Sequence, residues 1–106
     1  MRTYKTLLLL AVLAACAKGD PLERAQSAFR AGKFEDAMVL AQPLAQAGNP
    51  KAQVMLGLMF SQAKGAPEDF VTAALWFRKA AEQGYASGQF DLGYMYESGS
   101  GVPEDL

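Results

Sequence analysis

The chain has 106 residues, of which 51% are hydrophobic, and its 10 basic and 11 acidic side chains leave a net charge of −1. Because it has no histidine and only one cysteine, histidine-based triads, imidazole bases, thiolate metal sites and redox cysteine pairs are excluded. The lysines and arginines are scattered along the chain, so we expect no nucleic-acid, metal or cofactor ligand.

Residues 1–15 have the pattern of a bacterial export signal. Arg2 and Lys5 form a short cationic start, and residues 7–15 form an apolar run. Such a run is too short to cross a bilayer as a helix, which needs about 20 residues. We expect the segment to be removed on export, which leaves eight basic and eleven acidic residues and a net charge of −3.

The single cysteine ends the stretch Leu13-Ala14-Ala15-Cys16, which resembles the lipobox of bacterial lipoproteins. That resemblance implies cleavage before Cys16 and its acylation, so that a lipid anchor holds the mature chain on a membrane. Ala17 follows the cysteine, and under the enteric sorting rule this points to the outer membrane. The alternative is an ordinary cleavage site, Ala15-Cys16-Ala17, that releases a soluble periplasmic protein. Residues 16–21 would form a tether.

Residues 22–49 are predicted to fold as a helix hairpin with helices at about 22–31 and 35–47. The stretch resembles a plain tetratricopeptide repeat, because Gly32-Lys33-Phe34-Glu35-Asp36-Ala37 matches the usual turn into the second helix. Pro43 falls inside that second helix, where a proline removes a hydrogen bond and predicts a bend. Asn49-Pro50 then predicts the start of the next helix, because proline is favoured in the first turn.

Residues 50–85 are predicted to form a second helix hairpin, broken in the middle by Lys64-Gly65-Ala66-Pro67 and ended at Gly84 by a left-handed cap. Residues at helical spacing define one packing face in each half. They are Ala52, Leu56, Met59 and Phe60 in the first half and Ala73, Trp76, Phe77, Ala80 and Ala81 in the second. Gly57 lies inside the first face, where we expect it to allow the backbone of a second helix to come close. Trp76 is expected to fill the space between hairpins.

The second hairpin begins to repeat at once, with a constant offset of 36 residues. Leu56-Gly57 returns as Leu92-Gly93, and Gly65 to Asp69 return as Gly101 to Asp105. A fixed period of this size is typical of a solenoid, in which each unit covers an apolar face of its neighbour. We therefore expect an all-α superhelix of about five short helices in a repeat domain at 22–106. Its units would span about 22–49, 50–85 and 86–106, with the last unit incomplete after a helix at about 87–97.

The end of the repeat leaves apolar residues without cover, because aromatic side chains at 90, 94 and 96 cannot all face inward on one helix. A terminal repeat usually carries a polar cap, and no cap is predicted here. Either the sequence is a fragment of a longer array, or another chain covers the open side. The first interpretation is favoured, because the sequence stops in mid-motif.

The repeat resembles the Sel-one-like repeat (SLR) family, a branch of the tetratricopeptide-type α-solenoids. The family pattern is roughly A-x-x-x-L-G-x-x-Y, then a glycine-rich turn ending in G-V-x-x-D, then A-x-x-W-x-x-x-A-A-x-x-G. The matching residues are Ala52, Leu56, Gly57, Phe60, Gly65, Ala66, Asp69, Ala73, Trp76, Ala80, Ala81 and Gly84, followed by Leu92, Gly93, Tyr96, Gly99, Gly101, Val102 and Asp105. Phe60 replaces tyrosine, Ala66 replaces valine and Gly88 replaces alanine. The resemblance implies an α-solenoid that binds proteins, and says little about the partner.

Two acidic pairs, Glu68-Asp69 and Glu104-Asp105, are candidates for catalytic carboxylates. Each pair follows a proline and precedes a predicted helix, so capping of the free helix N–H groups is the favoured interpretation. Glu35-Asp36 is the same feature in the first unit. No catalytic residue is therefore expected.

In related solenoids the first helix of each hairpin lines the concave side, and its unused positions contact the ligand. By this resemblance, the predicted partner-binding residues are Lys51, Val54, Leu58 and Gln62 in one unit and Ser87, Phe90, Tyr94 and Ser98 in the next. Val54, Leu58, Phe90 and Tyr94 would form an apolar patch for a peptide or helix. The alternative is that some of these residues, Phe90 and Tyr94 above all, only complete the packing.

The sequence thus predicts a non-catalytic adaptor, scaffold or regulator that holds a protein or peptide partner at the bacterial cell envelope. The alternative is a β-lactamase-like hydrolase, an activity reported for some cysteine-rich Sel-one-like relatives. This chain lacks their cysteine pairs, and no nucleophile with a base is evident in its sequence.

Overall fold

The structure is a computed structural model that describes residues 19–102, and all regular secondary structure in this range is helical. The five helices are α2 (Pro21–Arg30), α3 (Phe34–Gln46), α4 (Pro50–Ser61), α5 (Phe70–Glu82) and α6 (Ala86–Ser98). The predicted all-α superhelix of about five helices is confirmed. The predicted signal sequence, Cys16 and the pair Glu104-Asp105 lie outside the described residues.

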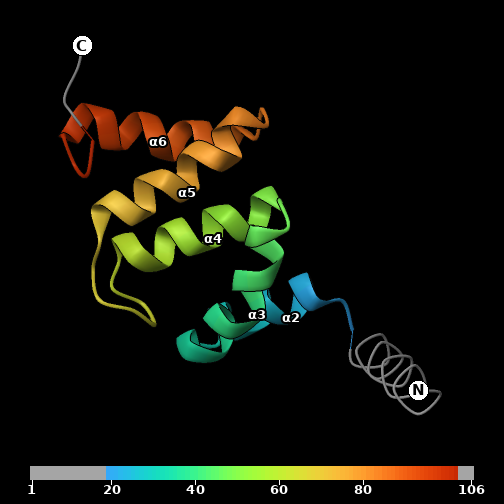
Figure 1. Ribbon diagram of the computed structural model, residues 1–106. Coiled ribbons are helices and arrows are strands. Elements are labelled where there is room, and N and C mark those ends of the chain that lie inside the picture. The colour runs from blue at the N-terminus through green and yellow to red at the C-terminus, as the bar shows by residue number, and fades with distance from the viewer. Residues whose placement is uncertain (1–18, 103–106) are drawn as a thin grey trace, which may run out of the picture.

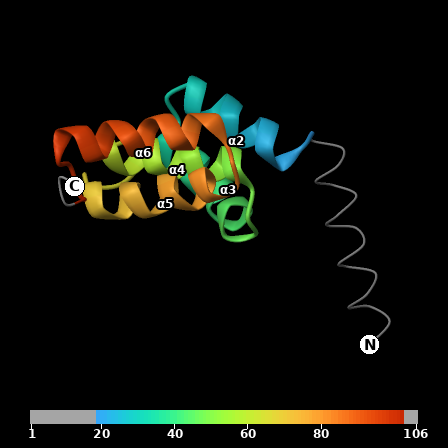
Figure 2. The same ribbon diagram turned by 90° about the horizontal axis from the view of Figure 1, so that it is seen from above.

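The helices form a stack in chain order, from α2 at one end to α6 at the other (Figure 1). Each helix packs mainly against its neighbours in sequence, and α4 also touches α6. Seen from the α6 end, helices α4, α5 and α6 overlap, as expected for helices stacked on one another (Figure 2). Since contacts beyond the nearest neighbours are few, this is the arrangement expected of a solenoid.

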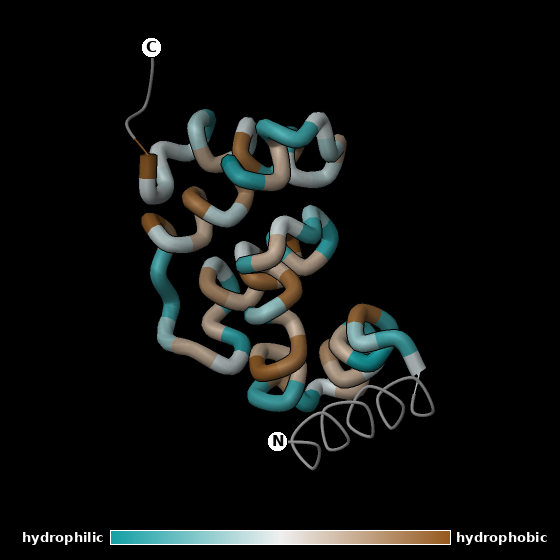
Figure 3. Tube along the Cα trace, turned by 45° about the vertical axis from the view of Figure 1, so that its right-hand side comes forward, coloured by the Kyte–Doolittle hydropathy of each residue, from teal (hydrophilic) through white to brown (hydrophobic). Residues whose placement is uncertain are grey.

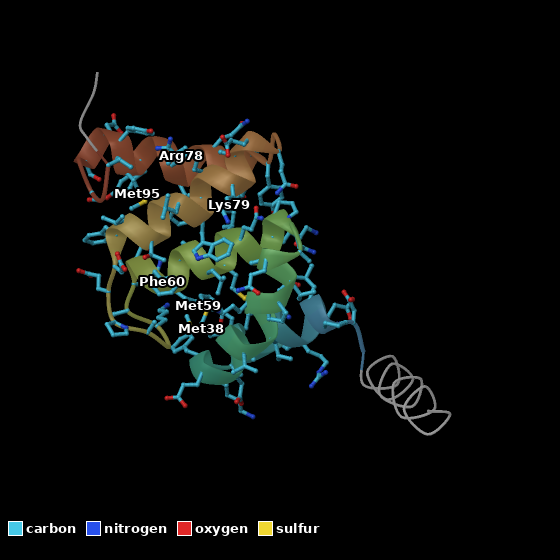
Figure 4. The ribbon with its side chains drawn as sticks, viewed as in Figure 1. Met38, Met59, Phe60, Arg78, Lys79 and Met95 are labelled. Atoms are coloured by element: carbon cyan, nitrogen blue, oxygen red, sulfur yellow. The ribbon has the colours of Figure 1, made fainter. Side chains whose placement is uncertain are left out.

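Two clusters of buried side chains hold the stack together, and hydrophobic residues accordingly recur in every helix (Figure 3). The first cluster joins α2, α3 and α4 through Ala25, Ala37, Ala41, Ala45, Ala52, Met55, Leu56 and Met59. The second joins α4, α5 and α6 through Val54, Ala73, Ala74, Phe77, Ala80 and Met95. Small alanines allow neighbouring helices to approach closely, while the larger side chains, such as Met59 and Met95 in Figure 4, fill the remaining space.

Trp76 connects the two hairpins, as the sequence predicted. It belongs to α5, yet its ring packs against the first cluster, which is built from α2, α3 and α4. The ammonium group of Lys79, one helical turn further on, lies 4.7 Å from the ring centroid. A cation over an aromatic face is attracted by the ring's electron density, so Lys79 helps to hold the indole in this position.

Glycines at two helix positions, Gly57 and Gly88, allow α5 to pack closely against α4 and α6. The kind of contact at Gly57 differs from the one predicted. The prediction that a helix backbone approaches Gly57 is wrong, because the ring of the buried Phe77 occupies that space and a Cβ on Gly57 would lie 2.6 Å from its Cδ1. The close backbone approach occurs instead at Gly88, where an added Cβ would lie 2.9 Å from the backbone nitrogen of Ala81. Helix α6 therefore packs closely on α5 at Gly88, the position that departs from the family's alanine.

The loop that follows the first helix of a unit is fitted against the preceding unit. Gly65 has a positive φ of 81°, and a Cβ on it would lie 2.9 Å from the carbonyl oxygen of Phe34 at the start of α3. Gly101, 36 residues later, meets the carbonyl of Phe70 at the start of α5 in the same way. Only glycine satisfies both the backbone conformation and this contact, so the loop glycine sets the register between units.

The helix ends confirm most of the predicted capping signals. The exception is Glu35-Asp36, because the N-cap residue of α3 is Lys33 and no side chain caps this helix through a hydrogen bond. Asn49 accepts hydrogen bonds from the backbone N–H groups of Lys51 and Ala52 at 2.9 and 3.1 Å, which caps α4. Asp69 caps α5, because its carboxylate accepts a hydrogen bond of 3.1 Å from the backbone N–H of Thr72. Gly84 adopts the predicted left-handed conformation after α5. Helix α3 continues through Pro43, and the bend expected there stays a prediction.

Candidate functional site

A groove of about 450 Å³ lies where α4, α5 and α6 meet. Three helices and the residues that follow α4 and α6 contribute side chains to it, with mostly apolar groups and a few hydroxyls. The lining residues are Leu58 and Ser61 from α4, Gln62 directly after α4, Phe70 and Phe77 from α5, Phe90, Asp91, Tyr94, Met95 and Ser98 from α6, and Ser100.

The groove combines a packed base with exposed aromatic walls. Phe77 and Met95 are buried members of the second cluster and cannot move without disturbing the core. Phe90 and Tyr94 on α6 are 76% and 64% exposed, and Phe70 is 38% exposed. Large rings exposed beside a rigid base are typical of a surface that binds an apolar side chain of another molecule.

The structure brings five of the eight predicted partner-binding residues together in this groove. Leu58, Gln62, Phe90, Tyr94 and Ser98 all line it. Lys51 and Ser87 are exposed near the other ends of α4 and α6 and do not contribute to its lining. The site therefore uses the C-terminal end of α4 and the middle and C-terminal part of α6.

Val54 is the exception among the residues of the predicted apolar patch. It is only 9% exposed, because it belongs to the second cluster, between α4, α5 and α6. The expectation that it offers surface to a partner does not hold in this structure. The apolar patch consists of the exposed rings of Phe90 and Tyr94 and the partly buried Leu58, without Val54.

Sequence reasoning missed three of the lining residues that give the groove its character. Phe70 and Phe77 come from the second helix of the hairpin, which was assigned to packing alone, although Phe77 reaches the groove past the missing side chain of Gly57. Asp91 was not singled out. The signal was present in the period, because Asp91 follows the apolar packing residue Met55 by 36 positions.

Asp91 is the one charged residue among the lining side chains. It is partly buried, and desolvation raises the pKa of its carboxyl group above the ordinary value of 3.8. Asp69 behaves in the opposite way, because its hydrogen bonds with the side chain and backbone of Thr72 lower the pKa of its carboxyl group. Asp69 is thus a helix cap, whereas Asp91 carries a charge that its surroundings do not stabilise.

Another concave surface of the described chain has more charged residues in its lining than the groove has. A wider hollow of about 710 Å³ beside α2 and α3 is lined by charges of both signs, including Glu23, Arg24, Lys33 and Asp36. Within residues 19–102, no three metal-ligating side chains come together in a group. None of the helices between Pro21 and Ser98 has the length and apolar character required to span a membrane.

The comparison with known protein families gives one match. The model of the Sel1 repeat matches residues 50–85 and 86–106, which is more than half of the chain. No curated protein matches the sequence.

Two solved structures are similar to the chain in fold and sequence. One is a Sel1 repeat protein from Oxalobacter formigenes, with a TM-score of 0.75 and 33% identity over 79% of this chain and 35% of that one. The other is a protective antigen present in uropathogenic Escherichia coli strains that displays an SLR fold, with a TM-score of 0.76 and 35% identity over 86% of this chain and 21% of that one. The chain therefore spans about a third and about a fifth of the lengths of these proteins.

Proposed function

Because the chain belongs to the Sel1 repeat family, whose members are generally protein-interaction modules, we propose that it is an adaptor or regulator that binds a protein or peptide partner in the groove of α4, α5 and α6. It would act without catalysis, by presenting a rigid concave surface. The partner would insert an apolar side chain between Leu58 on α4 and Tyr94 on α6.

The observation that carries this proposal is the exposure of Phe90 and Tyr94 on one side of a concave site whose base is packed. Exposed aromatic rings bury a large area on binding and lose little conformational freedom, because each has only two side-chain torsions. Helix α6 is anchored on α5 through Met95, so the two rings are held on a rigid support. Binding would then require little reorganisation.

The proposal includes attachment to the bacterial cell envelope, with the mature chain facing the periplasm. Its support is the sequence alone: an export signal at 1–15 and the lipobox-like stretch that ends at Cys16. Several acyl chains on one cysteine would anchor the protein stably, since each buried CH₂ contributes about 0.8 kcal/mol. A tethered adaptor meets its partner at a raised local concentration. The outer membrane is the proposed location, and a soluble periplasmic form is the alternative.

A pull-down from envelope extracts tests the groove. We expect the wild-type chain to recover a partner that the double variant Leu58→Glu and Tyr94→Glu does not recover, because two carboxylates in an apolar groove oppose insertion of an apolar side chain. The matched control is Val71→Glu with Leu75→Glu, which changes two exposed aliphatic residues of α5 that do not line the groove. Recovery of the same partners by wild type and the groove variant would reject the site.

The mass of the mature N-terminus tests the anchor. A diacylated and N-acylated Cys16, together with accumulation of the precursor in the presence of globomycin, is the expected result. An unmodified terminus after Ala17 would support the soluble alternative. No observation on residues 19–102 favours the hydrolase alternative, and turnover of nitrocefin by the purified mature protein would contradict the non-catalytic assignment.

A further inference from the structure

Asp91 stands at a position that the repeat otherwise uses for packing. Its equivalent 36 residues earlier is Met55, which is 7% exposed and belongs to the first cluster. On α6 the neighbouring residues Gly88 and Met95 still face α5 and are buried. A carboxylate has therefore replaced an apolar contact in the middle of a packing face, which lowers stability unless the charge has another purpose.

The described chain offers the Asp91 carboxylate no compensating partner. Desolvation is the only cause of its raised pKa, and neither a hydrogen bond nor a neighbouring charge of residues 19–102 contributes. The serine hydroxyl groups of the groove are engaged elsewhere: Ser61 donates to the carbonyl of Leu58 at 3.1 Å, and Ser98 lies 3.3 Å from the carbonyl of Met95 and 2.9 Å from the hydroxyl of Ser100. The charge is left facing the groove.

The groove therefore has a net negative charge on an apolar surface. Its lining contains no lysine or arginine, and Asp91 is its one charged group. The exposed rings of Phe90 and Tyr94 add to the preference for a cation, because the face of an aromatic ring attracts positive charge. A positive group that enters the groove would pair with a carboxylate that has already lost part of its hydration, so less of the desolvation cost remains to be met on binding.

We infer that the groove binds a segment of a partner protein in which a lysine or arginine side chain lies beside an aromatic or aliphatic anchor, with the cation at Asp91 and the anchor against Leu58 and Tyr94. This inference rests on the proposed function and specifies the chemistry of its ligand.

Three small probes with one ring and different charges test the inference. Phenethylammonium, 2-phenylethanol and 3-phenylpropionate would be titrated into the full chain, and binding would be followed by NMR chemical-shift changes of the groove residues. We expect phenethylammonium to bind roughly fivefold more tightly than the neutral alcohol, as for a partly buried ion pair. The carboxylate probe should bind most weakly, because it is repelled by Asp91.

Variants separate the charge preference from binding to the groove itself. In Asp91→Asn, phenethylammonium and the alcohol should bind equally, while the affinity of the alcohol stays as in wild type. The matched control is Glu97→Gln, an exposed carboxylate of α6 that does not line the groove and should leave the preference intact.

Each result has one meaning. If the anionic probe binds wild type as tightly as the cationic one, or if the preference survives in Asp91→Asn, the inferred ligand chemistry is wrong while the groove itself stands. If none of the probes shifts the groove resonances, the proposed binding site and its charge preference are both rejected.

Discussion

At the scale of single residues, glycine is needed at one position of the repeat and not at the equivalent position of the next unit. Gly57 and Gly93 are separated by one repeat period of 36 residues. A Cβ on Gly57 would collide with the buried ring of Phe77, whereas no atom of the described chain lies within 4 Å of a Cβ on Gly93. The lack of a side chain is therefore required at Gly57, whereas the described residues place nothing over Gly93 that would require it.

This contrast gives a matched pair of substitutions. We expect Gly57→Ala to lower the free energy of unfolding by about 1–3 kcal/mol, because the ring of Phe77 must leave its position in a packed core. Gly93→Ala should raise it by about 0.5–1 kcal/mol, because alanine favours the helix and meets nothing. Equilibrium unfolding in urea measures both values. An unchanged or raised free energy of unfolding in Gly57→Ala would contradict the packing described for Gly57, and a lowered value in Gly93→Ala would contradict the open space described there.

Asp91 gives stability a pH dependence of defined sign. Its pKa in the folded chain is raised by desolvation above the ordinary value of 3.8, so the folded state holds this proton more tightly than the unfolded state does. The stability linked to the proton is present below the ordinary pKa and is lost as pH rises through the raised one. We expect Asp91→Asn to exceed wild type in Tm at neutral pH, with the difference vanishing below 3.8.

At the scale of whole elements, α4 depends on its surroundings more than any other helix. Its residues from Ala52 to Gly57 are all buried, because α3, α5 and α6 cover it from different sides. Asn49 caps its first turn by accepting hydrogen bonds from two free backbone N–H groups. Pro50 is the first residue of the helix, where its ring fixes the backbone angle φ near the helical value. The cap and the packing therefore both stabilise α4.

Loss of this cap should destabilise the whole domain. Asn49→Ala is expected to lower the free energy of unfolding by about 1 kcal/mol, since two backbone N–H groups of α4 lose their acceptor. Asn49→Ser keeps an acceptor at the cap and should stay close to wild type. Thermal unfolding followed by circular dichroism measures the difference. Equal losses for both variants would show that the amide packs rather than caps.

At the scale of the molecule, stability is expected to follow the order of the stack. The inner helices α3, α4 and α5 are packed on two sides, whereas α2 and α6 each pack mainly on one neighbour. In a solenoid the contacts between neighbours sum along the chain, so the ends open before the centre.

Hydrogen exchange of the backbone amides tests this gradient. We expect the slowest exchange in α4 and the fastest helical exchange in α2 and α6, because opening an end breaks one interface and opening the centre breaks two. Deuterium uptake by NMR or mass spectrometry gives the order. Uniform protection from α2 to α6 would mean that the stack opens only as one cooperative unit.

The arrangement of helices and caps could be predicted from the sequence. The period of 36 residues, the cap Asn49-Pro50 and the position of Trp76 between hairpins all follow from local spacing. The residues of each cap are close together in the sequence, and the residues of the packing faces recur every 36 positions. Their partners can be named without coordinates, because helix periodicity alone determines which residues share a face.

The detailed shape of the groove depended on contacts between helices. Whether Val54 faces solvent, whether Phe77 or a backbone fills the space over Gly57, and whether Asp91 reaches the groove are set by how closely α6 approaches α4 and α5. That approach is governed by side-chain volumes at Gly88 and Ala80, which act together across two helices. Periodicity assigns a residue to a face of its own helix, but burial depends on the distance to the next helix, and only the packed structure supplies that distance.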